Sequence, residues 1–142
     1  MGCSDIQYIN SISVTDYNHL CKSAGWKELA TKQAQTGINN SSYIVSAVNG
    51  DKTVGMARVV SDGGYVAIIV DVVVLPEFQG KGIGKTMMNM VMEHISSSIA
   101  EGEGVSVILM AAKSKESFYK QFGFRERPDE KFGPGMTQWI SK

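Results

Sequence analysis

The sequence is poor in several features whose abundance would indicate a special class of protein. Only Cys3 and Cys21 are cysteines among 142 residues, which excludes a disulfide framework and indicates a reducing compartment. No apolar run reaches the roughly 18 residues that a membrane-spanning helix needs. Neither sign of charge is in excess, because 14 basic residues balance 14 acidic ones. The composition therefore favours neither a nucleic acid nor a membrane as a partner.

The first residues also lack the pattern of a targeting segment. They contain neither a basic stretch nor the apolar stretch that follows it in a secretory signal peptide. Ile6 stands where the myristoylation pattern requires serine or threonine. Together with the low cysteine content, these features lead us to expect a cytoplasmic protein.

What the sequence does contain is typical of one globular domain. Hydrophobic residues make up 43% of the chain and charged residues 20%, and the chain is long enough to bury a core. No repeat, linker or low-complexity tract divides it. We therefore predict a single domain over residues 1–142.

Hydrophobic periodicity and turn residues predict an α/β fold around a mixed sheet. A helix should begin at a cap on Thr15 or Asp16 and end near Gly25, and Gly123 should follow the last helix. The predicted strands are residues 6–12, 42–48, 52–60, 65–75, 105–110, 124–126 and 136–140; the other predicted helices are residues 26–36, 82–99 and 114–122.

Residues 72–86 join a buried strand to a helix through a loop rich in glycine. The start of a helix has unpaired backbone N–H groups and a partial positive charge, and glycines let an anion approach the backbone closely. A P-loop would need glycine where Gln79 stands, and a dinucleotide-binding loop would need glycine where Lys85 stands. The segment thus predicts a phosphate site of another kind.

Two motifs resemble those of the GNAT family of N-acetyltransferases. Gln79, Gly82 and Gly84 form the pattern Gln-x-x-Gly-x-Gly, which resembles the coenzyme A pyrophosphate loop of that family. Residues 118–124 read Phe-Tyr-Lys-Gln-Phe-Gly-Phe, which resembles the family signature Phe-Tyr-x-x-x-Gly-Phe. Residues 71–74, Asp-Val-Val-Val, are similar to the plant and cyanobacterial serotonin N-acetyltransferase-like branch.

The resemblance implies a fold and a cosubstrate. The fold is a central, mostly antiparallel twisted sheet of six to seven strands with about four helices, and a V-shaped splay separates the strands that end at Leu75 and Met110. Acetyl-CoA is the implied cosubstrate, with no metal. Its pantetheine arm would bond to the backbone of Val72, Val73 and Val74. Its pyrophosphate would be held by Gln79, Gly80, Lys81, Gly82, Ile83, Gly84 and Lys85.

The reaction needs a neutral amine and a proton for the departing thiolate. An aliphatic amine has a pKa of about 10 and a thiol one of about 8.5, so a base and a weak acid suffice. The resemblance makes Tyr119 the acid; otherwise it is an aromatic packed under the cofactor. Asp71 is the only charge in residues 65–75. It is a base, direct or through water, an anchor for a cationic substrate, or a salt-bridge partner of Arg58 or another neighbour.

The function implied is transfer of an acetyl group to a primary amine of a small molecule, an arylalkylamine or a polyamine, by direct attack in a ternary complex. Two alternatives remain open, a protein lysine or N-terminal acetyltransferase and a non-catalytic acetyl-CoA-binding module. A closed pocket under Tyr17, Trp26 and Phe132 would favour a small amine, and an open groove a protein. A homodimer is also left open.

Overall fold

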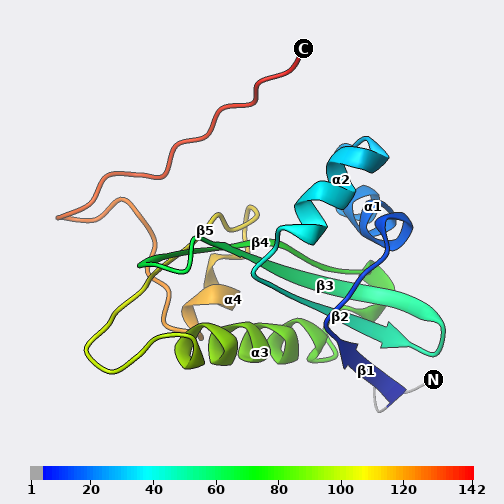
Figure 1. Cartoon of the computed structure of the whole chain (residues 1–142), viewed down its shortest axis with the longest axis horizontal. Coiled ribbons are helices and arrows are strands. Elements are labelled where there is room, and N and C mark those ends of the chain that lie inside the picture. Colours follow the sequence, from blue (N-terminus) through cyan, green and yellow to red (C-terminus); the bar gives the residue numbers. More distant parts are fainter. Residues whose placement is uncertain (1–4) are drawn as a thin grey trace. The chain divides into compact units, whose positions relative to one another are not determined.

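The computed structural model of the protein describes residues 5–142, so Cys3 lies outside the described part (Figure 1). The chain forms two compact units, one that ends at Leu109 and one over Met110–Lys142. The first unit contains a five-stranded sheet in the order β1-β2-β3-β4-β5. Its strands are β1 (Ile6–Ile9), β2 (Tyr43–Asn49), β3 (Lys52–Ser61), β4 (Val66–Val74) and β5 (Ser106–Leu109).

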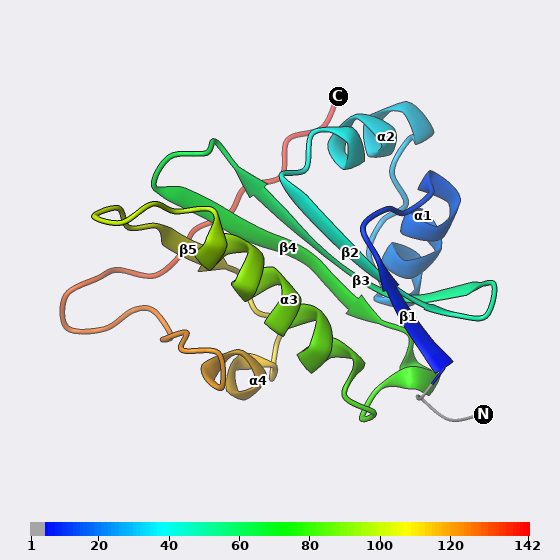
Figure 2. The same cartoon turned by 60° about the horizontal axis from the view of Figure 1, so that its bottom comes forward.

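Helices cover both faces of this sheet. They are α1 (Val14–Ser23), α2 (Thr31–Asn39), the short 3₁₀ helix η2 (Pro76–Phe78) and α3 (Ile83–Ser97). Figures 1 and 2 show α3 along one face of the sheet and the α1–α2 pair against the opposite face. The second unit contains α4 (Glu116–Lys120).

The core of the first unit lies between α3 and the sheet. Met87, Met88 and Val91 of α3 are fully buried, so the cluster of methionines fills the core here. Gly55 of β3 leaves room for this helix, because a Cβ at that position would stand 3.1 Å from the Met87 Cε atom. A side chain at residue 55 would therefore crowd the Met87 side chain and the Val73 carbonyl, which also lies 3.1 Å from that Cβ position.

Part of β4 has no partner strand on the side of β5, where the sequence predicted a splay between the two strands. β4 pairs with β5 in parallel only from Val66 to Ile69, opposite Ser106 to Leu109. All other neighbours in the sheet are antiparallel. From Val70 to Val74, β4 runs on with β3 on one side and no strand of the described chain on the other.

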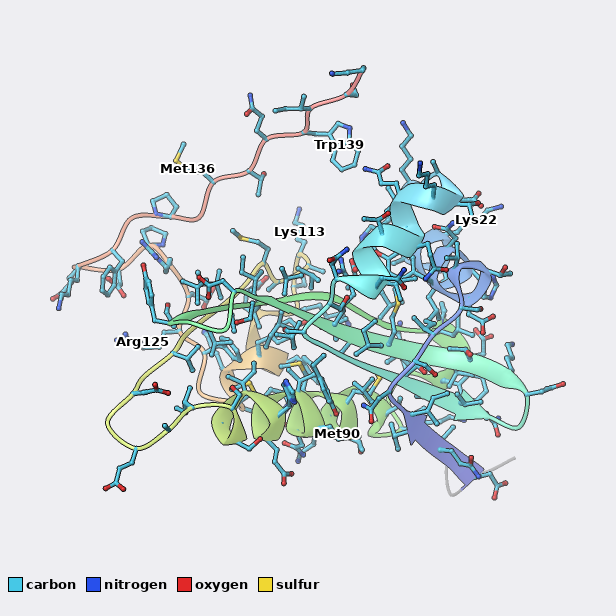
Figure 3. The ribbon with its side chains drawn as sticks, in the orientation of Figure 1. Lys22, Met90, Lys113, Arg125, Met136 and Trp139 are labelled. Atoms are coloured by element: carbon cyan, nitrogen blue, oxygen red, sulfur yellow. The ribbon has the colours of Figure 1, made fainter. Side chains whose placement is uncertain are left out.

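Two predicted strands are absent, which corrects the expected six to seven strands to five. Residues 124–126 and 136–140 have no ladder partner and no strand conformation. Met136 and Trp139 are 88% and 72% exposed on the extended C-terminal segment, where Figure 3 labels them. Apolar side chains alone do not make a strand, because its backbone groups need a partner in a ladder.

The α1–α2 region also differs in detail from the prediction. Ser13, rather than Thr15 or Asp16, caps α1, since its Oγ atom accepts a hydrogen bond from the Asp16 amide at 3.1 Å. The second helix begins five residues later than predicted, at Thr31 rather than residue 26. The Asn18 side chain explains the delay, because it bonds to both the amide and the carbonyl of Leu29 and holds that segment out of the helix.

Candidate active site

A β-bulge interrupts β4 where the predicted site begins. Met56 pairs with Val73 but Arg58 pairs with Val70, so Asp71 and Val72 together face one residue of β3. Asp71 has a φ of 56°, in the left-handed region. That conformation costs a non-glycine residue about 1–2 kcal/mol, although aspartate adopts it more readily than most. Surrounding contacts must hold the residue there.

Those contacts are an ion pair and a hydrogen bond on one carboxylate oxygen. Arg58 Nε donates to Asp71 Oδ2 at 2.9 Å, and the Tyr17 hydroxyl donates to the same atom at 2.7 Å. The salt bridge with Arg58 that the sequence suggested is therefore confirmed, and both of its side chains are 17% exposed. Burial, and then Asp71 beside it, raise the pKa of the Tyr17 phenol well above its ordinary value. Nothing in the sequence pairs Tyr17 with a residue 54 positions away.

Arg58 reaches further than Asp71. Its Nη1 atom donates to the Gly37 carbonyl near the end of α2 and to Ser41 Oγ in the connection to β2, each at 3.1 Å. One guanidinium thus joins the bulge of β4 to the end of α2, and Tyr17 joins the same carboxylate to α1. Arginine suits such a junction because its planar fork donates in several directions at once.

The three valines after Asp71 do not all face the open edge of β4. The Leu75 amide donates to the Val54 carbonyl at 2.8 Å, and the Val73 carbonyl lies 3.1 Å from where a Cβ on residue 55 would stand. Leu75 and Val73 therefore turn their backbone groups to β3. By the alternation of an antiparallel ladder, Val72 and Val74 turn theirs to the open edge.

The glycine loop follows directly and has the backbone shape that an anion site needs. Gly80 and Gly82 have φ values of 75° and 86°, and no heavy atom lies within 4 Å of a Cβ built on either. Gly82 is the N-cap residue of α3, so the first amides of a 15-residue helix open into this space. These residues fit a pyrophosphate, because its oxygens could approach a bare backbone.

The side chains of the loop differ in their contacts and in their burial. Gln79 Nε2 donates to the Val74 carbonyl at 2.9 Å, so this side chain ties the loop to the end of β4. Ile83 is 2% exposed and anchors α3 in the core, which leaves only its backbone for a ligand. Lys81 lies over the Phe78 ring at 5.7 Å, and Lys85 is exposed on the first turn of the helix.

Tyr119 lies on α4 in the second unit and has an aromatic environment of its own. Its ring makes edge contacts with Phe118 and Phe124, at centroid distances of 5.0 and 6.4 Å. The residue is 9% exposed, and burial raises the pKa of its phenol. The hydroxyl therefore keeps its proton at neutral pH. The other predicted site residues all belong to the first unit.

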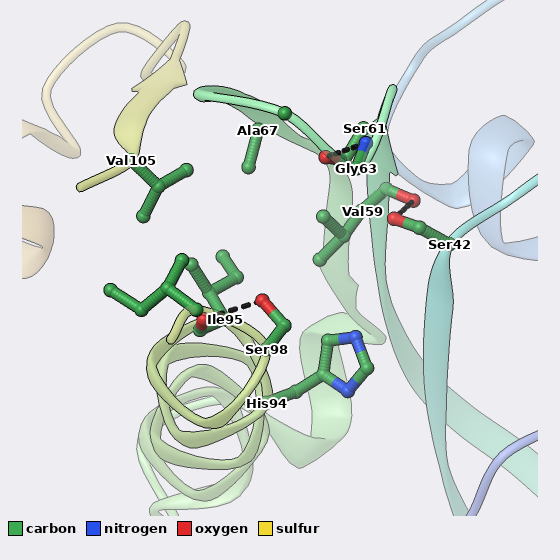
Figure 4. A pocket seen from close by; sticks show the side chains of 11 residues that line it. Ser42, Val59, Ser61, Gly63, Ala67, His94, Ile95, Ser98 and Val105 are labelled. Carbon is green, nitrogen blue, oxygen red and sulfur yellow. Dashed lines mark hydrogen bonds between the residues drawn. The ribbon is translucent and has the colours of Figure 1, made fainter. Parts of the chain in front are cut away.

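The first unit also has a cavity of about 120 Å³ that is separate from this site. Val59, Ala67, His94, Ile95 and Ser98 are among its lining residues (Figure 4). It lies at the C-terminal end of α3, roughly 20 Å along the helix from the glycine loop. His94 is half-buried, and its ring stacks on Tyr43 at 4.2 Å. The Ser98 and Ser42 hydroxyls are both satisfied by backbone carbonyls.

Within residues 5–142, no cluster of three or more metal-binding side chains occurs. The helices of the same range include none with the length and apolar character of a membrane span.

Comparison with known proteins identifies the family. The family model for the acetyltransferase (GNAT) domain matches residues 9–138. An N-acetyltransferase, ycf52, described as uncharacterized, from Pyropia yezoensis is 35% identical over 123 residues, which are 84% of this chain and 68% of that protein. Serotonin N-acetyltransferase 2, chloroplastic, from Oryza sativa subsp. japonica is 35% identical over 79 residues, which are 55% of this chain and 37% of that protein.

A solved structure agrees over nearly the whole length. A protein from meticillin-resistant Staphylococcus aureus, described as a probable acetyltransferase of unknown function, superposes with a TM-score of 0.83 at 29% identity. The match covers 94% of this chain and 99% of that one. The open edge of β4, the left-handed glycine loop and these matches together show that this protein is an acyltransferase and belongs to the GNAT family of N-acetyltransferases.

Proposed function

We propose that the protein transfers the acetyl group of acetyl-CoA to a primary amine of a small molecule, by direct attack of the amine in a ternary complex. The observation that carries this proposal is the adjacency of two features in the first unit. The open edge of β4 at Val72 and Val74 leads directly into the left-handed glycine loop at the start of α3. An extended chain that ends in a pyrophosphate matches both features.

In this proposal each part of coenzyme A has its own binding residues. Val72 and Val74 bond to the pantetheine arm through backbone groups, as an added strand would. The amides of the loop from Gly80 to Lys85 hold the pyrophosphate, and Lys81 and Lys85 add positive charge near it. Acetyl-CoA supplies the activated acetyl group as a thioester.

Tyr119 is the proposed acid for the departing thiolate. Its pKa is raised by burial, so the phenol is present in its protonated form throughout the range in which a thiol of pKa about 8.5 ionises. A phenol close to the sulfur would then donate its proton to the thiolate as the thiolate leaves.

Asp71 is the second proposed catalytic residue. Its Oδ2 atom already accepts from Arg58 and Tyr17, which leaves Oδ1 to take a proton from the amine, directly or through a water molecule. We expect Asp71→Asn to lower kcat at least tenfold with little change in the Kd of coenzyme A. The asparagine keeps the shape and tolerates a positive φ. If Asp71→Asn keeps full activity between pH 6 and pH 9, the carboxylate serves only the ion pair.

The small-amine acceptor is supported by the rice relative, which is named for serotonin. The cytoplasmic location expected from the sequence stays a prediction, and the name of the rice relative includes "chloroplastic".

The test is a panel of acceptors with release of the coenzyme thiol as the readout and mass spectrometry of the product. Serotonin and tryptamine represent arylalkylamines, spermidine represents polyamines, and peptides with a free lysine or a free N-terminus represent proteins. We expect turnover with at least one small amine and none with peptides. Turnover with peptides alone would assign the protein-acetyltransferase function instead. Binding of coenzyme A without any turnover would leave a binding module.

A further inference from the structure

Arg58 stands at a junction that the acetyl-transfer chemistry does not explain. It lies on β3 beside the bulge and binds three partners, Asp71 Oδ2 at 2.9 Å and, with its Nη1 atom, the Gly37 carbonyl and Ser41 Oγ at 3.1 Å each. The Tyr17 hydroxyl completes the cluster from α1. These contacts connect the two helices on one face of the sheet to the one irregular residue of β4.

The bulge is the feature that most needs such support. Asp71 holds a left-handed backbone, with a φ of 56°, in the middle of a strand. A conformation of this kind persists when neighbouring contacts fix the residue. Both contacts recorded on the Asp71 side chain, from Arg58 and Tyr17, converge on one oxygen.

The bulge also decides which backbone groups meet a ligand. Val72, directly after Asp71, turns its amide and carbonyl to the open edge because the bulge inserts an extra residue into β4. Without the bulge, the residue that follows would face the opposite edge. The conformation of Asp71 therefore sets the strand edge that the proposed function assigns to pantetheine.

We propose that Arg58 is a positioning residue that fixes the β4 bulge through Asp71 and fixes the end of α2 to that bulge. This one guanidinium then supports coenzyme A binding at the strand edge and keeps α2 beside Asp71, the proposed base for the amine, without touching either ligand. The inference rests on the proposed function for the identity of the two ligands. It predicts two separable effects, one carried by the bond to Asp71 and one by the bonds to Gly37 and Ser41.

The first effect is tested with the full chain and coenzyme A itself. Arg58→Met keeps an unbranched apolar stem and leaves the Asp71 carboxylate without its cation, so we expect the Kd of coenzyme A, measured by calorimetry, to rise about tenfold. In the double variant with Asp71→Gly, glycine adopts the positive φ freely and no carboxylate remains. We expect the Kd of coenzyme A for this double variant to lie within about twofold of the Kd for Asp71→Gly alone. Lys22→Met, which removes an exposed cation from α1, is the control and should bind as the parent does.

The second effect is tested with Arg58→Lys, which also serves if Arg58→Met does not fold. The three N–H donors of a lysine ammonium lie on one nitrogen, so the ammonium keeps the pairing with Asp71 but does not also reach Gly37 and Ser41, which the guanidinium contacts through a second nitrogen. We expect the KM of the best amine to rise about tenfold while the Kd of coenzyme A changes less than threefold.

Two results would overturn the proposal. One is a folded Arg58→Met variant that binds coenzyme A within twofold of the parent; the other is an Arg58→Lys variant with unchanged KM. If the parent binds coenzyme A but acetylates no amine, the proposed function fails, and the coenzyme A affinities of the Arg58 and Asp71 variants still decide whether Arg58 positions the strand edge.

Discussion

Two buried tyrosines carry the hydroxyl groups whose removal we expect to be most informative. Tyr119 carries one of them on α4, and Tyr17 carries the other on α1. Both phenols are buried, and the pKa of each is raised. Only Tyr17 has a carboxylate partner, so the two hydroxyls should respond differently to removal.

For Tyr119, we expect Tyr119→Phe to lower kcat roughly 100-fold or more, the usual contribution of a positioned acid. The change removes almost no volume, so folding and the Kd of coenzyme A should be kept. Steady-state rates with one accepted amine at matched cofactor saturation measure the effect. A ratio of parent to variant near one would mean that Tyr119 is packing and that water or the amine's own proton protonates the thiolate.

For Tyr17, the raised pKa predicts a loss of stability at alkaline pH. The unfolded chain releases the phenol proton near pH 10, whereas the fold retains it because of burial and the nearby carboxylate. The unfolded state therefore binds fewer protons above that pH, and its free energy falls relative to the fold by up to about 1.4 kcal/mol per pH unit. Burial raises the pKa of the Cys21 thiol too, so the decline should begin below pH 10.

Urea unfolding between pH 8 and pH 11 measures this slope. Tyr17→Phe should make it shallower, and it should also lower stability at neutral pH because Asp71 loses a hydrogen-bond donor. Tyr65→Phe is the control, since Tyr65 is 70% exposed and its removal should leave the slope as it was. Equal slopes in all three proteins would show that Tyr17 does not hold its proton in the fold.

At the scale of elements, the turn from β4 into α3 allows the effect of backbone strain to be separated from an effect on ligand binding. Gly82 and Gly102 share a φ of 86°, and a Cβ on either has open space around it. Gly82→Val and Gly102→Val should therefore cost similar stability, because valine tolerates this conformation poorly at both sites. Only Gly82→Val should also weaken coenzyme A binding, by tenfold or more, since its side chain enters the space assigned to the pyrophosphate. Calorimetry that finds equal Kd values for both variants would show that the loop does not hold coenzyme A.

Strong local patterns explain which elements the sequence predicts well. The ends of β4 and α3 lie within two residues of the predicted ends. The apolar run of β4, the helical spacing of α3 and the glycines at their boundaries are local signals. The predicted start of α2 was wrong because Asn18 of α1 forms hydrogen bonds with the amide and the carbonyl of Leu29. The two C-terminal strands were wrong because pairing depends on a partner that composition does not reveal.

The candidate site shows the same division between local and distant information. The glycine loop was predicted from local sequence, and the single charge in a buried strand was enough to suggest the Asp71–Arg58 salt bridge. The Tyr17 contact and the left-handed conformation of Asp71 depend on residues brought together by the fold, and no spacing in the sequence encodes them.

At the scale of the whole molecule, ligand binding should be visible as stability. A ligand that binds only the folded state stabilises it by about 2.7 kcal/mol at 100 times its Kd, which corresponds to a rise in Tm of roughly 5 to 10 °C for a chain of this size. We expect coenzyme A to produce this rise in a thermal scan. ATP at the same concentration is the control, because it has phosphates but no arm for the edge of β4. An equal shift with ATP would indicate an unspecific anion site.

The short parallel ladder between β4 and β5 has a consequence for synthesis on the ribosome. Val66 pairs with Ser106, which is 40 residues later in the chain. β3 and β4, in contrast, are joined by a tight turn. At about 5–20 residues per second, Val66 is synthesised roughly 2 to 8 seconds before Ser106. During that interval the nascent chain presents an unpaired strand edge rich in valine and isoleucine, which is the kind of surface that associates with other chains. Chaperone demand should therefore be highest after β4 has emerged and before β5 has emerged, and slower elongation during that interval should lower the yield of native protein.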